Sequence, residues 1–274
     1  MKKSIFFLFV FISAALIFTS FASAQSAGYR GQSISGSTGL LSIPSARVGW
    51  NEAGIDFGYR AVMNNEAGIS HIPSVTASFF NILELSAAFD IQPERNNHIN
   101  NDLLLGIKIR LPLPGNTSIA IGAAAQLLNT GSEEFFYSAY QPYIAITYAG
   151  SLFNMSAETT VVFGKTLYTI HENNSNIDFG MGFDLVLFPD VFGNVLHWII
   201  DFANYSYSDN SWPNYAQYHT PAVHRGILNT GFRIDLSAIP AIKNLKIIID
   251  FIFNDLFDAG SRSFTAGAVF GFKL

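Results

Sequence analysis

A strict alternation of apolar and polar residues between positions 177 and 185 constrains the fold of this chain more than any other feature. The segment reads IDFGMGFDL: one set of alternate positions holds Ile, Phe, Met, Phe and Leu, and the other holds Asp, Gly, Gly and Asp. A repeat of two residues places these sets on opposite faces of a β-strand, whereas a helix needs a repeat of 3.6 residues. The segment is therefore predicted to be a strand with one apolar face and one face of small and acidic residues.

The same alternation recurs along the chain and predicts twelve strands. They cover residues 55–60, 75–79, 83–89, 103–111, 119–127, 140–148, 153–163, 177–187, 196–202, 228–236, 245–253 and 264–274. The spacing of about 21 residues per strand and connection suits antiparallel strands of about ten residues. Ten or fourteen strands are the alternatives, because Asn81 and Gly150 are weak turn signals and residues 25–52 could also pair.

The distribution of charge favours a barrel that spans a membrane. Only 13% of the residues are charged and 49% are hydrophobic, whereas average soluble domains carry about 25% charged residues. The apolar faces carry no charged residue in mid-strand, and Lys165 falls on an apolar face only at the end of its strand. A soluble β-sandwich, the alternative, would place its charges on the outer faces. We therefore predict an antiparallel transmembrane β-barrel over residues 53–274.

Residues 1–24 have the pattern of a secretory signal peptide. Two lysines precede an apolar run over residues 5–18, and Ala22, Ser23 and Ala24 form a small-x-small cleavage site. The alternative is a retained membrane anchor. No later apolar run reaches the roughly 18 residues of a spanning helix, and the chain has no cysteine, which excludes disulfides and thiol chemistry. The expected location is the outer membrane of a diderm bacterium, after cleavage near Ala24.

The predicted connections alternate in length. Shorter ones fall at residue 81 and at residues 112–117, 150–151, 189–194 and 237–244, and longer or more polar ones at residues 64–71, 92–101, 129–134, 166–176, 208–224 and 255–262. Outer-membrane barrels have short periplasmic turns and longer external loops, with both termini in the periplasm. The same arrangement is expected here, although residues 112–117 and 237–244 are no shorter than some outer loops.

Residues 25–52 are rich in Gly and Ser and lack a steady alternation. They are expected either to enter the lumen as a plug or to lie beneath the barrel in the periplasm, with a disordered leader as the simpler alternative. If the segment enters the lumen, Arg30 and Arg47 are expected to pair with acids of the wall.

The last strand resembles the C-terminal strand that the barrel assembly machinery recognises. Thr265, Gly267, Phe270 and Phe272 occupy its polar, glycine and aromatic positions. Many such strands end on the aromatic residue, whereas two residues follow Phe272 here, and an ordinary amphipathic strand is the alternative. The resemblance implies that the assembly machinery and outer-membrane lipids are partners.

Residues 36–48 read GSTGLLSIPSARV and resemble the TGL…PSAR stretch that opens the YjbH-like outer-membrane barrels. Residues 81–86 and 106–108 are similar to strand sequences of the same family. The similarity covers about the first third of the chain, which is much shorter than full-length members. The resemblance implies a barrel and, as one alternative function, an association with exopolysaccharide export.

The polar faces of the predicted strands collect charged residues that would line the lumen. Those that could form a constriction are Asp56, Arg60, Glu84, Asp102, Lys108, Arg110, Glu158, Asp178, Asp184, Asp201, Arg233, Asp235 and Asp250, and Asp90, Lys246 and Lys273 lie on the same faces. An excess of acids would favour cations or neutral solutes, but the charges could instead pair and brace a narrow barrel. We therefore expect a narrow channel for small solutes, or a structural or surface barrel. The net charge of −5, with no basic block, excludes nucleic acid as a partner.

A lipid-modifying barrel enzyme is the rival class, but the sequence gives it little support. A hydrolase needs Ser or Thr beside a His with an orienting partner. Only His197 is expected within a strand, near Asp201, and it is more simply a luminal polar group with satisfied hydrogen bonds. His219 and His224 share an outer loop with aromatic residues that could bind a metal or a sugar. No phosphate loop, nucleophile elbow or metal motif is present, so we predict no catalytic residue, metal or cofactor.

Overall fold

The computed structural model describes residues 30–64, 68–92, 101–129, 137–152, 155–168, 177–204, 226–239, 245–257 and 262–274. The predicted signal peptide and its cleavage site lie outside these ranges. Within them, no helix is long and apolar enough to cross a membrane.

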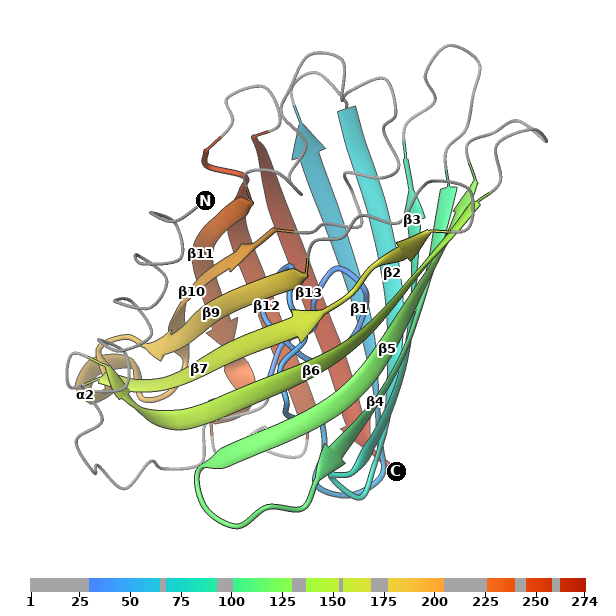
Figure 1. Cartoon of the computed structure of the whole chain (residues 1–274). Helices are drawn as coiled ribbons and strands as arrows, with labels where there is room; N and C mark the ends of the chain where they lie inside the picture. The colour runs from blue at the N-terminus through green and yellow to red at the C-terminus, as the bar shows by residue number, and fades with distance from the viewer. Residues whose placement is uncertain are drawn as a thin grey trace, which may run out of the picture.

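The described residues form a ring of antiparallel strands (Figure 1). The strands are β1 (Gly54–Asn64), β2 (Gly68–Phe79), β3 (Leu83–Ile91), β4 (Asn101–Leu111), β5 (Thr117–Asn129), β6 (Tyr137–Leu152), β7 (Met155–Gly164), β8 (Leu167–Tyr168), β9 (Asp178–Val186), β10 (Leu196–Ala203), β11 (Ile227–Asp235), β12 (Leu245–Asn254) and β13 (Ser263–Lys273). The first and last strands, β1 and β13, pair with each other, and β5 pairs with β6, so the sheet has no free edge. A short helix, α2 (Pro189–Phe192), and a 3₁₀ turn, η2 (Leu236–Ala238), lie in connections at the end that holds the C-terminus, called the inner end below.

The wall has twelve strands because β7 and β8 are two parts of one strand. β7 pairs Gly164 with Tyr143 of β6, and β8 continues the same register by pairing Leu167 with Tyr140. The interruption lies opposite Pro142, which has no backbone N–H to donate to the ladder. The fold is therefore a closed twelve-stranded antiparallel β-barrel, as the alternation predicts.

The structure corrects several boundaries of the predicted connections, some by a single residue and three by more. β2 begins at Gly68, so residues 68–71 are strand rather than loop, and the Tyr59 hydroxyl lies 2.6 Å from Nδ1 of His71. The turn predicted at residues 150–151 is wrong, because β6 continues until Leu152 pairs with Met155. The predicted loop over residues 166–176 begins with strand β8. In the first two cases polar or glycine residues at a strand end were interpreted as a turn, and in the third Leu167 and Tyr168 were included in a polar loop. Only the backbone pairing decides where a strand stops.

The outward faces form an apolar surface around the barrel. In β4, for example, Leu105, Ile107 and Ile109 are exposed, while Leu104 and Lys108 point inward and are buried. Among the described strand residues, the only exposed Asp, Glu, Lys or Arg is the last residue of β13. A charge at the midplane of a barrel's lipid face costs about 2–4 kcal/mol for Lys or Arg, so this surface suits hydrocarbon.

Candidate channel lumen and its N-terminal segment

Residues 30–53, called the N-terminal segment below, lie inside the barrel (Figure 1). The segment folds back on itself: the backbone N–H of Leu40 donates to the carbonyl of Ile43 at 3.0 Å, and that of Ser45 to the carbonyl of Thr38 at 2.9 Å. Most of its residues are buried. A compact piece of the same chain therefore occupies the lumen.

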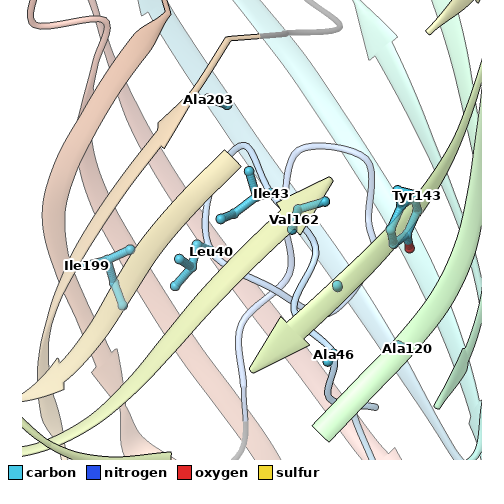
Figure 2. Close-up of a cluster of buried hydrophobic side chains, with 9 residues drawn as sticks. Leu40, Ile43, Ala46, Ala120, Tyr143, Val162, Ile199 and Ala203 are labelled. Atoms are coloured by element: carbon cyan, nitrogen blue, oxygen red, sulfur yellow. The ribbon is translucent and has the colours of Figure 1, made fainter. Parts of the chain in front are cut away.

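An apolar cluster joins the N-terminal segment to one side of the wall (Figure 2). The segment contributes Leu40, Ile43 and Ala46, and the wall contributes Ala120, Tyr143, Ala145, Val162, Ile199 and Ala203. Burial of apolar surface contributes roughly 25 cal/mol per Å², so this contact favours the seated position of the segment.

Two glycines of β9 make room for this contact. A Cβ atom at Gly180 would lie 2.5 Å from Cγ2 of Ile43, and one at Gly182 would lie 2.3 Å from Cδ1 of Leu40. The sequence interpretation assigned these small residues to a wet lumen, and that interpretation is wrong here. They lie against apolar side chains, because the segment fills the space in front of them.

Glu84 and Lys108, on neighbouring strands, form an ion pair that holds the segment. Lys108 Nζ lies 2.8 Å from Glu84 Oε1, and both side chains are 1% exposed. The Ser37 hydroxyl and the Thr38 backbone N–H donate to the same oxygen at 2.8 and 2.9 Å, and the Gly49 N–H donates to the other oxygen at 3.3 Å. A buried carboxylate is stable only when such donors replace its water.

Glu158 of β7 binds two arginines of the N-terminal segment. Arg30 donates through Nε and Nη2 at 2.9 and 2.6 Å, in the bidentate geometry that suits a carboxylate. Arg47 Nε lies 3.3 Å from the same carboxylate, and its Nη1 donates to the Ser118 hydroxyl at 2.7 Å. Burial acts to lower the pKa of Arg30, but the adjacent Glu158 carboxylate outweighs it and raises the pKa above its ordinary value. Arg30 therefore stays charged in the lumen.

Asp201 of β10 binds the backbone of the segment. The N–H groups of Leu41 and Ser42 donate to its Oδ2 at 2.8 and 2.7 Å, and Asn229 Nδ2 donates to its Oδ1 at 2.6 Å. The wall thus satisfies two backbone donors that the turn at this point leaves free.

Five strands contribute to a row of charged side chains along the wall. His197 Nδ1 lies 2.6 Å from Asp184, which lies 3.6 Å from Arg233. Arg233 donates to both oxygens of Asp250 at 2.7 and 3.1 Å, and Asp250 lies 3.7 Å from Arg60. Both arginines also donate to backbone carbonyls of the N-terminal segment. The row therefore braces the wall and anchors the segment together.

The closing strand β13 is bridged by an ion pair between its two neighbours. Asp56 of β1 and Lys246 of β12 both lie beside Gly271 in the register, and their charged groups meet at 2.7 Å across it. A Cβ atom at Gly271 would lie 2.0 Å from Asp56 Oδ1. The Arg60–Asp250 pair also crosses β13, at Gly267. Trp50 Nε1 also donates to Asp56 at 2.7 Å, which ties the segment to this closure.

The other predicted lumen residues bond to the wall near its ends. Their partners include Gln126 for Asp102, Gln141 and Thr166 for Asp178, Ser118 for Arg110, Gln92 for Asp90 and the Ser237 N–H for Asp235. Lys273 pairs with Glu52 at the inner end, where both are largely exposed. In β13, Thr265 points into the lumen and Phe270 points outward; the assembly role of this strand, including Gly267 and Phe272, stays a prediction.

His197 does not have the predicted partner. It contacts Asp184 rather than Asp201, and its Nε2 lies 2.9 Å from the carbonyl oxygen of Asn194. With both ring nitrogens engaged, none is left to activate a Ser or Thr hydroxyl. The histidine loop at residues 219–224 lies outside the described residues. Within them, no three His, Cys, Asp or Glu side chains gather as a metal site.

Sequence reasoning missed several side chains that bind the segment or belong to it, among them Gln32, Trp50, Thr147 and Asn229. Thr147 and Asn229 lie on inward-facing strand positions, so the strand pattern carried a usable signal for them. Gln32 and Trp50 precede the first strand, where no repeat indicates which way a side chain points.

The sequence matches no protein-family model and no curated protein, so the resemblance to YjbH-like barrels stays a prediction. Solved outer-membrane porins are similar in structure. A KdgM porin in complex with disordered oligogalacturonate has a TM-score of 0.50 at 10% identity and covers 80% of this chain and 99% of that chain. The NanC porin has a TM-score of 0.50 at 11% identity, and the match covers 81% of this chain and 100% of that chain. The chain therefore has the fold of a twelve-stranded outer-membrane porin.

Proposed function

We propose that the protein is an outer-membrane channel for small solutes whose bore is narrowed by its own N-terminal segment. The observation that supports this most is a closed barrel, apolar outside, whose inward faces carry charged and polar side chains around residues 30–53. The structural likeness to porins agrees with it. In this proposal the outward surface contacts outer-membrane lipids.

The N-terminal segment would set the width of the passage, because the wall holds it from many sides. Hydrogen bonds join it to side chains of β1, β2, β3, β4, β5, β6, β7, β10 and β11. A solute would have to pass beside the segment or wait for it to move. We therefore expect small conductance steps rather than those of an open pore.

Single-channel recording in planar bilayers tests this proposal. The mature chain is expected to give small, steady steps, and deletion of residues 30–50 is expected to enlarge them. A heat-dependent gel shift checks that each variant is a folded barrel. Silence from both folded proteins would contradict the channel, and equal steps from both would contradict the role of the segment.

A structural or surface barrel is the second candidate, and the density of bonds around the segment favours it. Silence of the full chain combined with conduction by the deletion variant would support this candidate. An exopolysaccharide-associated role and a lipid-modifying activity stay predictions without a specific contact in their favour.

A further inference from the structure

The outermost charges on the inward faces of three strands are all negative. Asp90, Asp102 and Asp178 occupy the outermost inward-facing positions of β3, β4 and β9, at the end opposite the C-terminus, called the outer end below. The inward-facing bases of the described strands are Arg60, Lys108, Arg110, Arg233 and Lys246; Arg60 lies four residues from the outer end of β1, and the others lie towards the inner ends of their strands. Lys165, near the outer end, falls on the outward side of the strand pattern. The outermost charged side chains on the inward faces of these strands are therefore acids.

Asp90 and Asp102 face each other directly across two strands. Like charges in opposed positions destabilise a sheet unless something compensates them. Asp90 is 8% exposed; Gln92 Nε2 donates to its Oδ2 at 3.2 Å, while its Oδ1 has no hydrogen-bond partner. Gln92 Oε1, in a side chain that is 4% exposed, also has none. Carboxylate and amide oxygens of this kind are the ligands that hard cations prefer.

The connections at the outer end carry the same sign of charge. By sequence, the six connections hold eight acids, namely Glu66, Glu94, Glu133, Glu134, Glu172, Asp209, Asp255 and Asp258, against the three bases Arg95, Arg225 and Arg262. An excess of acidic residues attracts cations and repels anions. This sequence observation is independent of the geometry at Asp90.

We propose that the outer mouth is a cation-selective entrance, with Asp90, Asp102 and Gln92 forming a weak site for a cation in transit. This inference rests on the proposed channel function and names its substrate class as small cations and cationic solutes, with polyanions repelled. The site is expected to have a low affinity for the cation, because a conducting site must release its ion. Two carboxylates and an amide oxygen supply too few ligands for a permanent metal.

The reversal potential in a KCl gradient tests the entrance. The full mature chain is expected to pass K⁺ in preference to Cl⁻, and Asp90→Asn combined with Asp102→Asn is expected to move the permeability ratio towards one. Asp190→Asn is the matched control, because Asp190 is an exposed acid of α2 at the inner end and outside the lumen. It should leave the ratio unchanged.

Anion preference in the full chain, or an unchanged ratio in the double variant, overturns the cation entrance and leaves the channel standing. If the chain passes no current, the proposed function fails, and Tb³⁺ luminescence on the folded protein in detergent still decides the site. Tb³⁺ is expected to bind the full chain more tightly than the double variant, with the Asp190→Asn protein equal to the full chain. Equal Tb³⁺ binding by all three overturns the site.

Discussion

Gly180 shows how a single absent side chain decides what the lumen can hold. A Cβ atom there would contact only Ile43 of the N-terminal segment closely, at 2.5 Å, and its next neighbours lie 3.6 Å away. The alternation predicted that Gly180 points inward, but no local pattern shows what stands opposite it. The pairing of distant residues is fixed by the folded ring, which a sequence read in windows does not contain.

We expect Gly180→Val to unseat Ile43, because overpacking a filled core costs roughly 1–3 kcal/mol. The free energy of unfolding in urea should fall by that amount, and the conductance should rise. Adding Ile43→Ala to Gly180→Val should restore part of the lost unfolding free energy and lower the conductance part of the way back. Gly106→Val is the control, because a Cβ at Gly106 meets only the movable Ser86 side chain. Equal losses of unfolding free energy in the two valine variants would contradict a specific contact between Gly180 and Ile43.

At the scale of strands, the sequence predicted the twelve wall strands and their faces, and the structure confirms both. The ends of the strands and the partners of their side chains were harder to predict from the sequence. The predicted pair of His197 and Asp201 lies in one strand, four residues or about 13 Å apart, whereas Asp184 reaches His197 from the adjacent strand. Which side chains meet is a property of the register, and the register is set by backbone pairing along whole strands.

We expect the Asp56–Lys246 pair across β13 to matter more than any exposed pair. Lys246→Met leaves Asp56 buried without its cation and should cost roughly 3–5 kcal/mol of unfolding free energy. The double variant Asp56→Asn with Lys246→Met should lose less, because both charges are gone. Lys273→Met breaks a pair that is largely exposed and should cost less than about 1 kcal/mol. Urea unfolding in detergent micelles measures all three, and equal losses for the two lysines would refute the bridge.

For the whole molecule, the decisive relation is between the ring and residues 30–53. The sequence left two places open for this segment, the lumen and the periplasm, because Gly- and Ser-rich stretches carry no periodic signal. In the structure the luminal charges that looked like a constriction, such as Glu84 and Glu158, are bound to the segment. The candidate site was therefore predictable as a set of inward charges, but not as a set of contacts.

We expect a disulfide between Ala46→Cys and Thr147→Cys to form readily in the folded barrel. The Ala46 N–H donates to the Thr147 hydroxyl at 2.8 Å, so the two residues are adjacent, and the chain has no native cysteine to interfere. Mild oxidation should change the gel mobility of the unfolded protein, and reduction should reverse it. Ala46→Cys with Arg262→Cys, at the opposite end of the barrel, should not crosslink; equal yields would place the segment elsewhere.

The last residue and the end of the N-terminal segment are joined, since the Leu274 N–H donates to the Ala53 carbonyl at 3.0 Å. Nine strands of the wall also bond to residues 30–53. The closed ring and the segment inside it therefore stabilise each other, and a change that releases the segment also removes hydrogen-bond partners from most of the strands.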